Sequence, residues 1–158
     1  MMFQQCHTAT DVAAVYRRLG FTRVCCVSGR VSLIAAPRLG AVAMSPKLGV
    51  RVRDQLVGHH RCESTPILTH TGTNRAWVFL VGPAWGRAMT SSTMHALATR
   101  GIRVLVGGQR IWLPMNDHPS GWRWLSPPVA ADQLPARTTV LAAARLELDL
   151  LLPQRISR

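Results

Sequence analysis

Arginine and tryptophan side chains recur close together along this chain, and their spacing carries more chemical meaning than any other pattern in it. Proteins that bind single-stranded nucleic acid stack bases on aromatic rings and hold the phosphates with cations. The neighbouring sets are Arg75 with Trp77, Trp85 with Arg87, Arg110 with Trp112, and Arg123 between Trp122 and Trp124. Because successive side chains on a strand alternate between faces, Trp122 and Trp124 share one face, and core packing is the alternative role for such rings.

The net charge points to the same class of partner. The 158 residues contain 19 Lys and Arg, of which only Lys47 is a lysine, against 7 Asp and Glu, and the formal net charge is +12. Such a protein gains affinity for polyanions, because each phosphate that it neutralises releases condensed counterions. The alternative is an ordinary soluble protein from an arginine-rich genome.

Cysteine and histidine side chains offer a zinc site as a further alternative. Zinc requires paired Cys and His ligands at compact spacing. The candidates are Cys6, Cys25, Cys26, His59, His60 and Cys62. The adjacent pair Cys25 and Cys26 falls on a strand that we expect to be buried, so buried thiols beside an exposed histidine loop are the favoured interpretation. Adjacent cysteines also argue against a disulfide framework, and we expect reduced thiols in the cytoplasm.

Local patterns predict the elements that must position these side chains. Helices are expected at 10–19, 45–57, 91–100 and 135–152. Strands are expected at 22–27, 31–35, 41–44, 67–70, 75–81, 103–106, 110–113 and 122–125. Strands mixed with three to four helices, without strict alternation, indicate an α+β fold with a mixed or antiparallel sheet in a single domain, 1–158. Residues 1–7 are expected to fray, and 153–158 to form a basic tail.

Turn and cap residues refine this layout. Hairpins are predicted around 71–74 and Gly107-Gly108-Gln109, and the strands on either side of 28–30 are expected to form a hairpin or to be two separate short strands. Asp11 is expected near the N-cap of the first helix, and the Ser91-Ser92 pair at that of the third. The chain has no signal peptide pattern and no apolar run of the ~20 residues that a membrane span needs, so no membrane partner is expected.

One segment carries a family resemblance: Gly101-Ile-Arg-Val-Leu-Val-Gly-Gly-Gln-Arg-Ile-Trp-Leu-Pro, followed by Gly121-Trp-Arg-Trp. It resembles the stretch near the end of bifunctional DNA primase/polymerase (prim-pol) domains of the archaeo-eukaryotic primase superfamily. That stretch reads Gly-Ile-Asp-Val-Arg-Gly-Asp-Gly-Gly-Tyr-Val-Val-Ala-Pro-Pro-Ser and then Gly-x-x-Tyr-x-Trp. The resemblance spans about residues 8–145, lacks most of the usual N-terminal region, and implies a primase or RRM-like core.

Three upstream segments follow the family's order. Residues 8–11 are similar to its Ala-Thr-Thr-Asp helix start. Residues 40–44 are similar to its first catalytic strand, and residues 66–80 to its Ser-Gly-Gly-x-His hairpin. The order of these weak matches adds to the resemblance of the later segment.

The resemblance also shows where the chain departs from the family. The family is expected to use two divalent ions for nucleotidyl transfer, and these hard cations need oxygen ligands. The family's Asp-x-Asp/Glu pair falls on Ser45 and Lys47, its later Asp on Arg103, and its motif His on Trp77. Residues 12–53 contain no Asp or Glu, so a shifted alignment does not restore the first pair. Cations in these places repel Mg²⁺ but attract phosphate oxygens. The resemblance further implies that Ser45, Trp77 and Arg103 line one cleft.

These observations predict a catalytically inactive prim-pol-like domain that binds nucleic acid, DNA rather than RNA, or nucleotide phosphates. All seven Asp and Glu are interpreted as solvated or ion-paired surface groups, so no catalytic residue, metal or cofactor is expected. The predicted contact residues are Lys47, Arg75, Trp77, Arg103, Arg110 and Arg123. The alternatives are a protein-interaction module that binds a partner or a second copy through the apolar C-terminal helix, a residual primase/polymerase, and a non-functional remnant.

Overall fold

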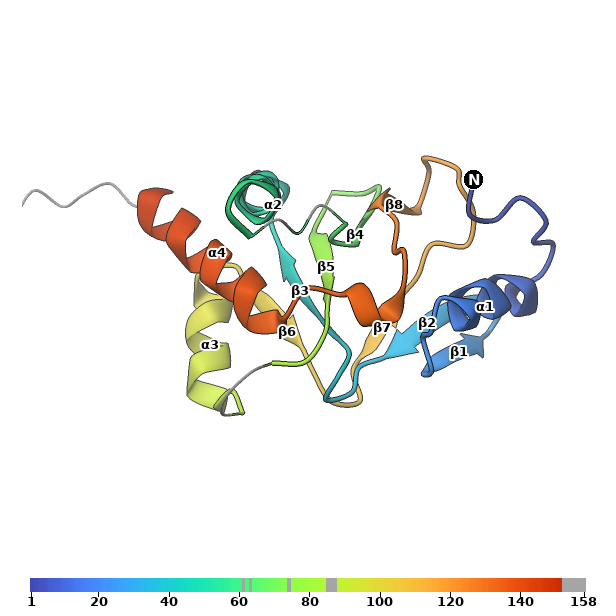
Figure 1. The fold of residues 1–158 in the computed structure, drawn as a ribbon, viewed down its shortest axis with the longest axis horizontal. Coiled ribbons are helices and arrows are strands. Elements are labelled where there is room, and N and C mark those ends of the chain that lie inside the picture. The colour runs from blue at the N-terminus through green and yellow to red at the C-terminus, as the bar shows by residue number, and fades with distance from the viewer. Residues whose placement is uncertain (61, 63, 74, 85–87, 152–158) are drawn as a thin grey trace, which may run out of the picture.

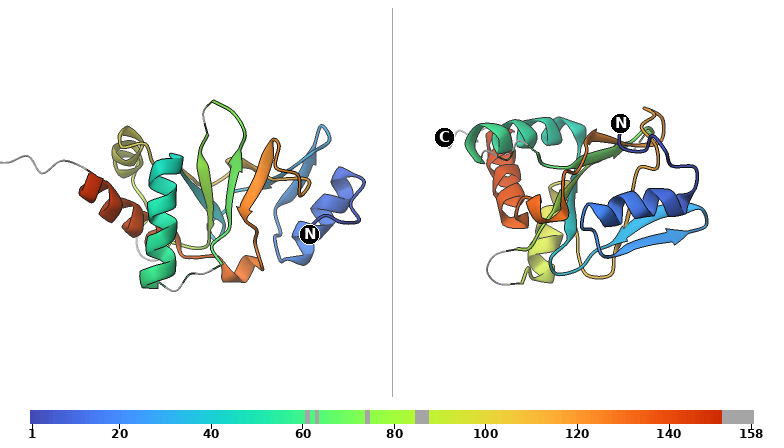
Figure 2. Two further views of the ribbon diagram at one scale, coloured as in Figure 1. Left: turned by 90° about the horizontal axis from the view of Figure 1, so that it is seen from above. Right: turned by 45° about the vertical axis from the view of Figure 1, so that its right-hand side comes forward.

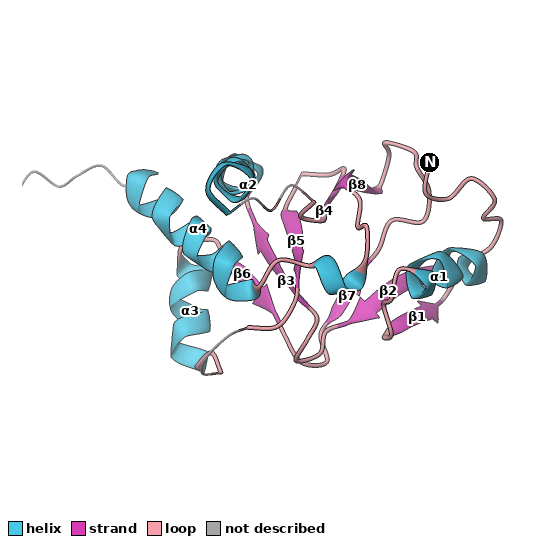
Figure 3. Ribbon diagram, viewed as in Figure 1, coloured by secondary structure: helices cyan, strands magenta, loops and turns pink. Residues whose placement is uncertain are grey.

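The computed structural model describes residues 1–60, 62, 64–73, 75–84 and 88–151. Its helices are α1 (Ala9–Arg18), α2 (Pro46–His60), α3 (Ser91–Thr99) and α4 (Arg137–Leu151), with a 3-10 turn η1 (Ala131–Gln133). Its strands are β1 (Val24–Val27), β2 (Arg30–Ile34), β3 (Gly40–Met44), β4 (Ile67–His70), β5 (Trp77–Val81), β6 (Arg103–Leu105), β7 (Arg110–Trp112) and β8 (Trp122–Ser126). Figure 1 labels the four α-helices and the eight strands, and Figure 3 colours the chain by type of secondary structure.

The strands form two sheets. The larger has the order β6-β3-β5-β4-β8 and the smaller β1-β2-β7, and every pairing in both is antiparallel. The predicted α+β class is therefore confirmed. The β4–β5 hairpin forms as predicted, and β1 and β2 form a hairpin, which was one of the two alternatives for that segment. The division into two sheets was not predicted.

The five-stranded sheet is covered on both faces. On one face Val42 and Phe79 belong to the core that α2, α3 and α4 complete. On the other face Ala41 and Leu80 belong to the core that contains α1 and the small sheet. Because side chains alternate along a strand, burial on both faces requires strands that are apolar throughout, such as β3. Figure 2 shows the large sheet between the helices α2, α3 and α4 and the unit formed by α1, β1 and β2.

The predicted hairpin between 103–106 and 110–113 is wrong. β6 pairs with β3 in the large sheet, whereas β7 pairs with β2 in the small one. The loop between them crosses from one sheet to the other beside the β2–β3 connection: the Gly108 N–H donates to the Ala35 carbonyl over 2.9 Å, and the Ala35 N–H donates to the Gln109 carbonyl over 2.8 Å. The glycines supply the turn, but long-range partners decide which strands pair.

Part of the segment 1–7, which is expected to fray, is anchored to the rest of the protein. Phe3 is 6% exposed and packs in the core around α1. The N–H groups of Met2 and Phe3 donate to the two carboxylate oxygens of Asp117, over 3.1 and 3.0 Å. This anchor is distant in sequence, so no local pattern revealed it. The predicted tail 153–158 lies outside the described residues.

Asp11 lies near the N-cap of α1 as predicted, whereas the N-cap of α3 differs from the prediction. Thr8 is the N-cap of α1, and Asp11 lies three residues inside, where its carboxylate accepts the Thr8 N–H over 2.8 Å in a capping box. The His7 N–H donates to the same carboxylate, and these hydrogen bonds lower the pKa of Asp11. Thr90, rather than the serine pair that follows it, caps α3.

Candidate phosphate-binding groove

A groove of about 400 Å³ opens at one end of the five-stranded sheet. Its lining consists of Ala43, Met44, Ser45, Arg75, Ala76, Ala98, Gly101, Ile102 and Arg103. These residues come from the end of β3, the segment before β5, the end of α3 and the start of β6. Segments far apart in the sequence therefore build the groove together.

Antiparallel pairing brings two arginines to this end of the sheet. β3 runs toward α2, and its neighbours β5 and β6 run in the opposite direction. The end of β3 therefore lies beside the beginnings of both neighbours, and Ala43 pairs with Arg103. Arg75 lies two residues before β5, and Ser45 directly follows β3. The topology thus brings Ser45, Arg75 and Arg103 to one groove.

Small side chains leave space between these arginines. Ala43, Ala76 and Ala98 contribute only methyl groups to the lining, and Gly101 has no side chain. Gly101 has a φ of +81°, a left-handed conformation that glycine adopts without strain just after a helix end. Ile102, which is fully buried, gives the groove an apolar base. The groove therefore combines small, uncharged side chains with two arginines.

The two groove arginines have no acidic partner in the described part of the chain. Arg75 is exposed, and its Nε donates to the Gly72 carbonyl over 3.3 Å. Arg103 is exposed as well. The three ion pairs formed among the described residues all involve α2 or α4. The positive charge at the groove is therefore not neutralised by those residues, and it attracts anions.

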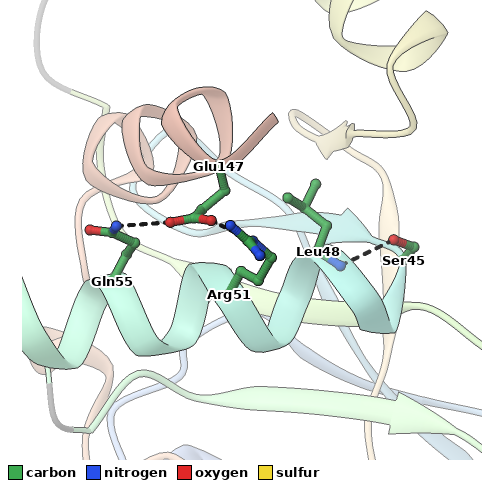
Figure 4. A network of polar contacts seen from close by, with 5 residues as sticks. All are labelled: Ser45, Leu48, Arg51, Gln55 and Glu147. Atoms are coloured by element: carbon green, nitrogen blue, oxygen red, sulfur yellow. Dashed lines mark hydrogen bonds and ion pairs between the residues drawn. The ribbon is translucent and has the colours of Figure 1, made fainter. Parts of the chain in front are cut away.

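Helix α2 begins at the rim of the groove. The Ser45 hydroxyl accepts the Leu48 N–H over 3.3 Å, as Figure 4 shows, and the Ser45 carbonyl accepts the Gly49 N–H over 2.8 Å. Ser45 is therefore the N-cap of α2. The first turn of α2 has no acidic residue and carries the exposed Lys47. The positive end of the helix dipole adds to the charge beside the groove.

The groove does not fit the divalent ions that the prim-pol resemblance implies. Mg²⁺ and Mn²⁺ take carboxylate oxygens as ligands, whereas the described lining of the groove has two guanidinium groups and no carboxylate. Among the residues that the structure describes, no three His, Cys, Asp or Glu side chains gather where they could hold a metal. We therefore derive no metal-dependent step for this site.

Trp77 lies near this end of the sheet but packs against α2. A Cβ atom at Gly49 would lie 2.8 Å from Cε3 of the indole, so the helix backbone passes close over the ring. The Arg53 guanidinium lies 5.5 Å from a ring centroid of Trp77. Trp77 is not part of the groove lining, so the expected convergence holds for Ser45 and Arg103 but not for Trp77.

Arg123 lies on β8, away from the groove lining. It pairs with Thr69, and its Nε is buried with no hydrogen-bond partner among the described residues. Trp122 and Trp124 both pack against the core that contains α1 and the small sheet, which confirms that they share one face of the strand as expected. The predicted pair Trp85 and Arg87 lies outside the residues that the structure describes.

Arg110 lies on the small sheet. Its Nη1 donates to the Ser32 hydroxyl over 2.9 Å, and its guanidinium carbon lies 5.3 Å from a ring centroid of Trp112. Arg30 approaches the same indole more closely, at 4.2 Å. Sequence analysis missed Arg30, because only the β2–β7 pairing brings it to Trp112.

Glu147 is buried, although all carboxylates were expected on the surface. Glu147 is 4% exposed; it accepts Nε of Arg51 over 2.6 Å and Nε2 of Gln55 over 2.8 Å. Figure 4 shows that this contact joins α4 to α2. The predicted ion pairing is confirmed for Glu147, but the predicted surface position is wrong.

The expectation that the adjacent cysteines lie on a buried strand is also wrong, since Cys25 is only partly buried and Cys26 is exposed.

No protein-family model, curated protein or solved structure matches this chain. The prim-pol resemblance therefore remains a prediction from the sequence. No helix in the described residues is long and apolar enough to cross a membrane.

Proposed function

We propose that this protein is a catalytically inactive prim-pol-like domain that binds nucleic acid or nucleotide phosphates, and that the groove takes a phosphate group between Arg75 and Arg103. The observation that carries the proposal is that two arginines line one groove and form no ion pair with any residue that the structure describes. Guanidinium groups bind phosphate oxygens through paired N–H donors. A net charge of +12 draws polyanions toward the molecule as a whole.

The electrostatics of the groove favour an anion over an empty site. Two like charges that border one groove repel each other, and an anion between them replaces repulsion by attraction. The N-terminus of α2 and Lys47 raise the potential at the same place. A phosphate with a double negative charge would be attracted by both arginines and by the positive potential at the start of α2.

Binding without nucleotidyl transfer is the expected result. Ser45 and Arg103 stand where the resembled family has metal-binding carboxylates, so the site would hold a nucleotide's phosphates without the ions that activate them. The preference for DNA over RNA rests on the resemblance alone. Primer extension with Mn²⁺ should accordingly give no product.

The proposal is tested by titration with deoxythymidine triphosphate in the absence of divalent ions. We expect Arg75→Gln and Arg103→Gln each to weaken binding about ten-fold, because each removes a charge-assisted hydrogen bond. Arg18→Gln on the exposed end of α1 is the matched control and should change the affinity less than two-fold. Equal affinities for the wild type and both groove variants would refute the proposal.

A protein-interaction module is the second candidate, because α4 exposes apolar side chains. Leu146 is 51% exposed and Leu150 63%, and their spacing puts them on one side of the helix. Affinity capture before and after nuclease treatment separates the two functions. Partners that survive nuclease and are lost in Leu146→Lys favour this candidate, whereas partners lost to nuclease favour the first.

A further inference from the structure

The small sheet has one covered face and one open face. α1 packs on the covered face, and its Tyr16 belongs to the same apolar core as Val31 and Leu33 of β2. Alternation along the paired strands sends the following residues to the other face: Cys25, Val27, Arg30, Ser32, Ile34, Arg110 and Trp112. None of these belongs to either apolar core. Figure 1 and the right-hand view of Figure 2 draw α1 against one face of β1 and β2 and no described element against the other.

Two arginines flank one indole on this open face. Ser32 pairs with Trp112 across β2 and β7, and Arg30 and Arg110 lie two residues away along the two strands. The guanidinium carbons lie 4.2 Å and 5.3 Å from ring centroids of Trp112, which is cation–π distance. The bond from Arg110 to the buried Ser32 hydroxyl fixes one end of the arrangement.

The open face is positively charged and has no acidic residue of its own. Arg30 and Arg110 are exposed, and neither forms an ion pair within the described ranges. The guanidinium of Arg30 lies over the Trp112 ring, so a planar cation on an aromatic base stands at the surface. Guanidinium planes and aromatic rings are the two side-chain surfaces on which unpaired bases stack.

We infer that Arg30, Trp112 and Arg110 form a stacking platform for the bases of single-stranded nucleic acid. A base lies against the Arg30 and Trp112 stack, and the guanidinium groups contact the phosphates on either side. A duplex does not fit this chemistry, because its base faces are covered by their neighbours. An acidic peptide would neutralise the charge but would have no use for the planar stack. The inference rests on the proposed nucleic-acid binding and adds the single strand and the place where bases bind.

The test compares two strands of the same length and charge. The probes are an oligothymidylate of about twelve nucleotides and an abasic strand of the same length, at one fixed salt concentration. We expect wild-type protein to bind the oligothymidylate about ten-fold more tightly, because base–aromatic stacking contributes that much. Equal binding of the two probes by wild-type protein would overturn the inference.

Arg30→Lys separates stacking from charge. Lysine keeps the positive charge but lacks the planar group, so the preference for bases should fall to about two-fold or less while the abasic affinity stays unchanged. Arg18→Lys is the matched control and should keep the full preference. Trp112→Leu should also lose the preference, and thermal unfolding checks that the variant is folded. A full preference in Arg30→Lys would contradict the platform.

The experiments can refute the groove and the platform independently of each other. Loss of triphosphate binding in Arg75→Gln with an unchanged base preference supports both the groove and the platform. An unchanged triphosphate affinity in the groove variants refutes the proposed function of the groove and leaves the base preference as evidence for the platform alone. An unchanged base preference in the Arg30 variant refutes the platform and leaves the groove standing.

Discussion

Two regions along α2 use arginine in opposite ways. In the middle of the helix, Arg51 donates to the buried carboxylate of Glu147 and ties α2 to α4. At the start of the helix, Arg75 and Arg103 border an open groove and have no acidic partner in the described residues. The same side chain therefore serves the fold in one place and remains available for a ligand in the other.

The difference between these regions lies in what each charge has lost on folding. Glu147 is shielded from water, so its carboxylate depends on Arg51 and Gln55 for its hydrogen bonds. Arg75 and Arg103 keep their contact with water and give up little on folding. Substitutions should consequently lower stability in the first region and ligand affinity in the second.

Glu147→Leu should have the largest effect on stability. The variant leaves Arg51 and Gln55 without their acceptor, and the partial exposure of Arg51 limits the loss to about 2 kcal/mol of unfolding free energy. Chemical denaturation measures the change, and triphosphate binding should remain as in the wild type. A loss below about 0.5 kcal/mol, within the range of ordinary surface substitutions, would remove the contrast between the regions.

Tyr16→Phe extends the comparison to a second buried polar group. The hydroxyl donates to the Pro114 carbonyl over 2.6 Å and accepts Nε1 of Trp124 over 2.9 Å, so its removal should cost about 1.5 kcal/mol. Burial also raises the pKa of Tyr16 above its ordinary value of about 10.

This raised pKa gives the protein a dependence on alkaline pH. In the unfolded chain the Tyr16 phenol ionises near pH 10, whereas in the folded protein it stays neutral to higher pH. The contribution of Tyr16 to the free energy of unfolding is therefore fully present below about pH 10 and is lost as the pH rises above that value. Tyr16 is the only tyrosine, and Tyr16→Phe should remove this part of the dependence. If the free energies of unfolding of the wild type and Tyr16→Phe fell equally above pH 10, Tyr16 would not be the source of this pH dependence.

Ser45→Ala should have a smaller effect at the boundary between the regions. Loss of the N-cap removes the acceptor for the Leu48 N–H and should cost about 1 kcal/mol. Ser45→Asn restores an acceptor and is the matched control, with an expected loss of a few tenths of a kcal/mol. Equal stability of the alanine and asparagine variants would show that the cap does not hold the start of α2.

Arg75→Gln and Arg103→Gln should have the smallest effect on stability. Both side chains are exposed and neither forms an ion pair with a described residue, so each unfolding free energy should change by less than about 0.5 kcal/mol. Thermal unfolding measured beside Glu147→Leu checks this. A groove variant as unstable as the Glu147 variant would mean that these arginines are part of the fold.

Local patterns predicted the elements of this fold better than their partners. Apolar residues at helical spacing located α1, α2 and α4, because each buries one stripe of its surface. The β6–β7 hairpin failed because glycines specify a turn and not the strands that pair beyond it. The anchor of the N-terminal segment was missed for a related reason, because Asp117 lies far along the chain from Met2 and Phe3.

The candidate sites were also hard to predict where they depend on contacts between residues far apart in the sequence. The resemblance aligned Ser45 and Arg103 with one cleft, and the structure places both on one groove with Arg75. It did not foresee that α2 packs over Trp77. Arg30 was missed because its contact with Trp112 exists only through the register of β2 with β7.

The central claim is that Arg75 and Arg103 are binding residues, and the salt dependence of oligonucleotide binding tests it most directly. Dissociation constants are measured over a range of salt for wild type, the double variant Arg75→Gln/Arg103→Gln and the control Arg18→Gln. We predict that the slope of log affinity against log salt falls by about two units in the double variant, one for each lost phosphate contact, and by much less in the control. The same slope in the wild type and the double variant would contradict the claim.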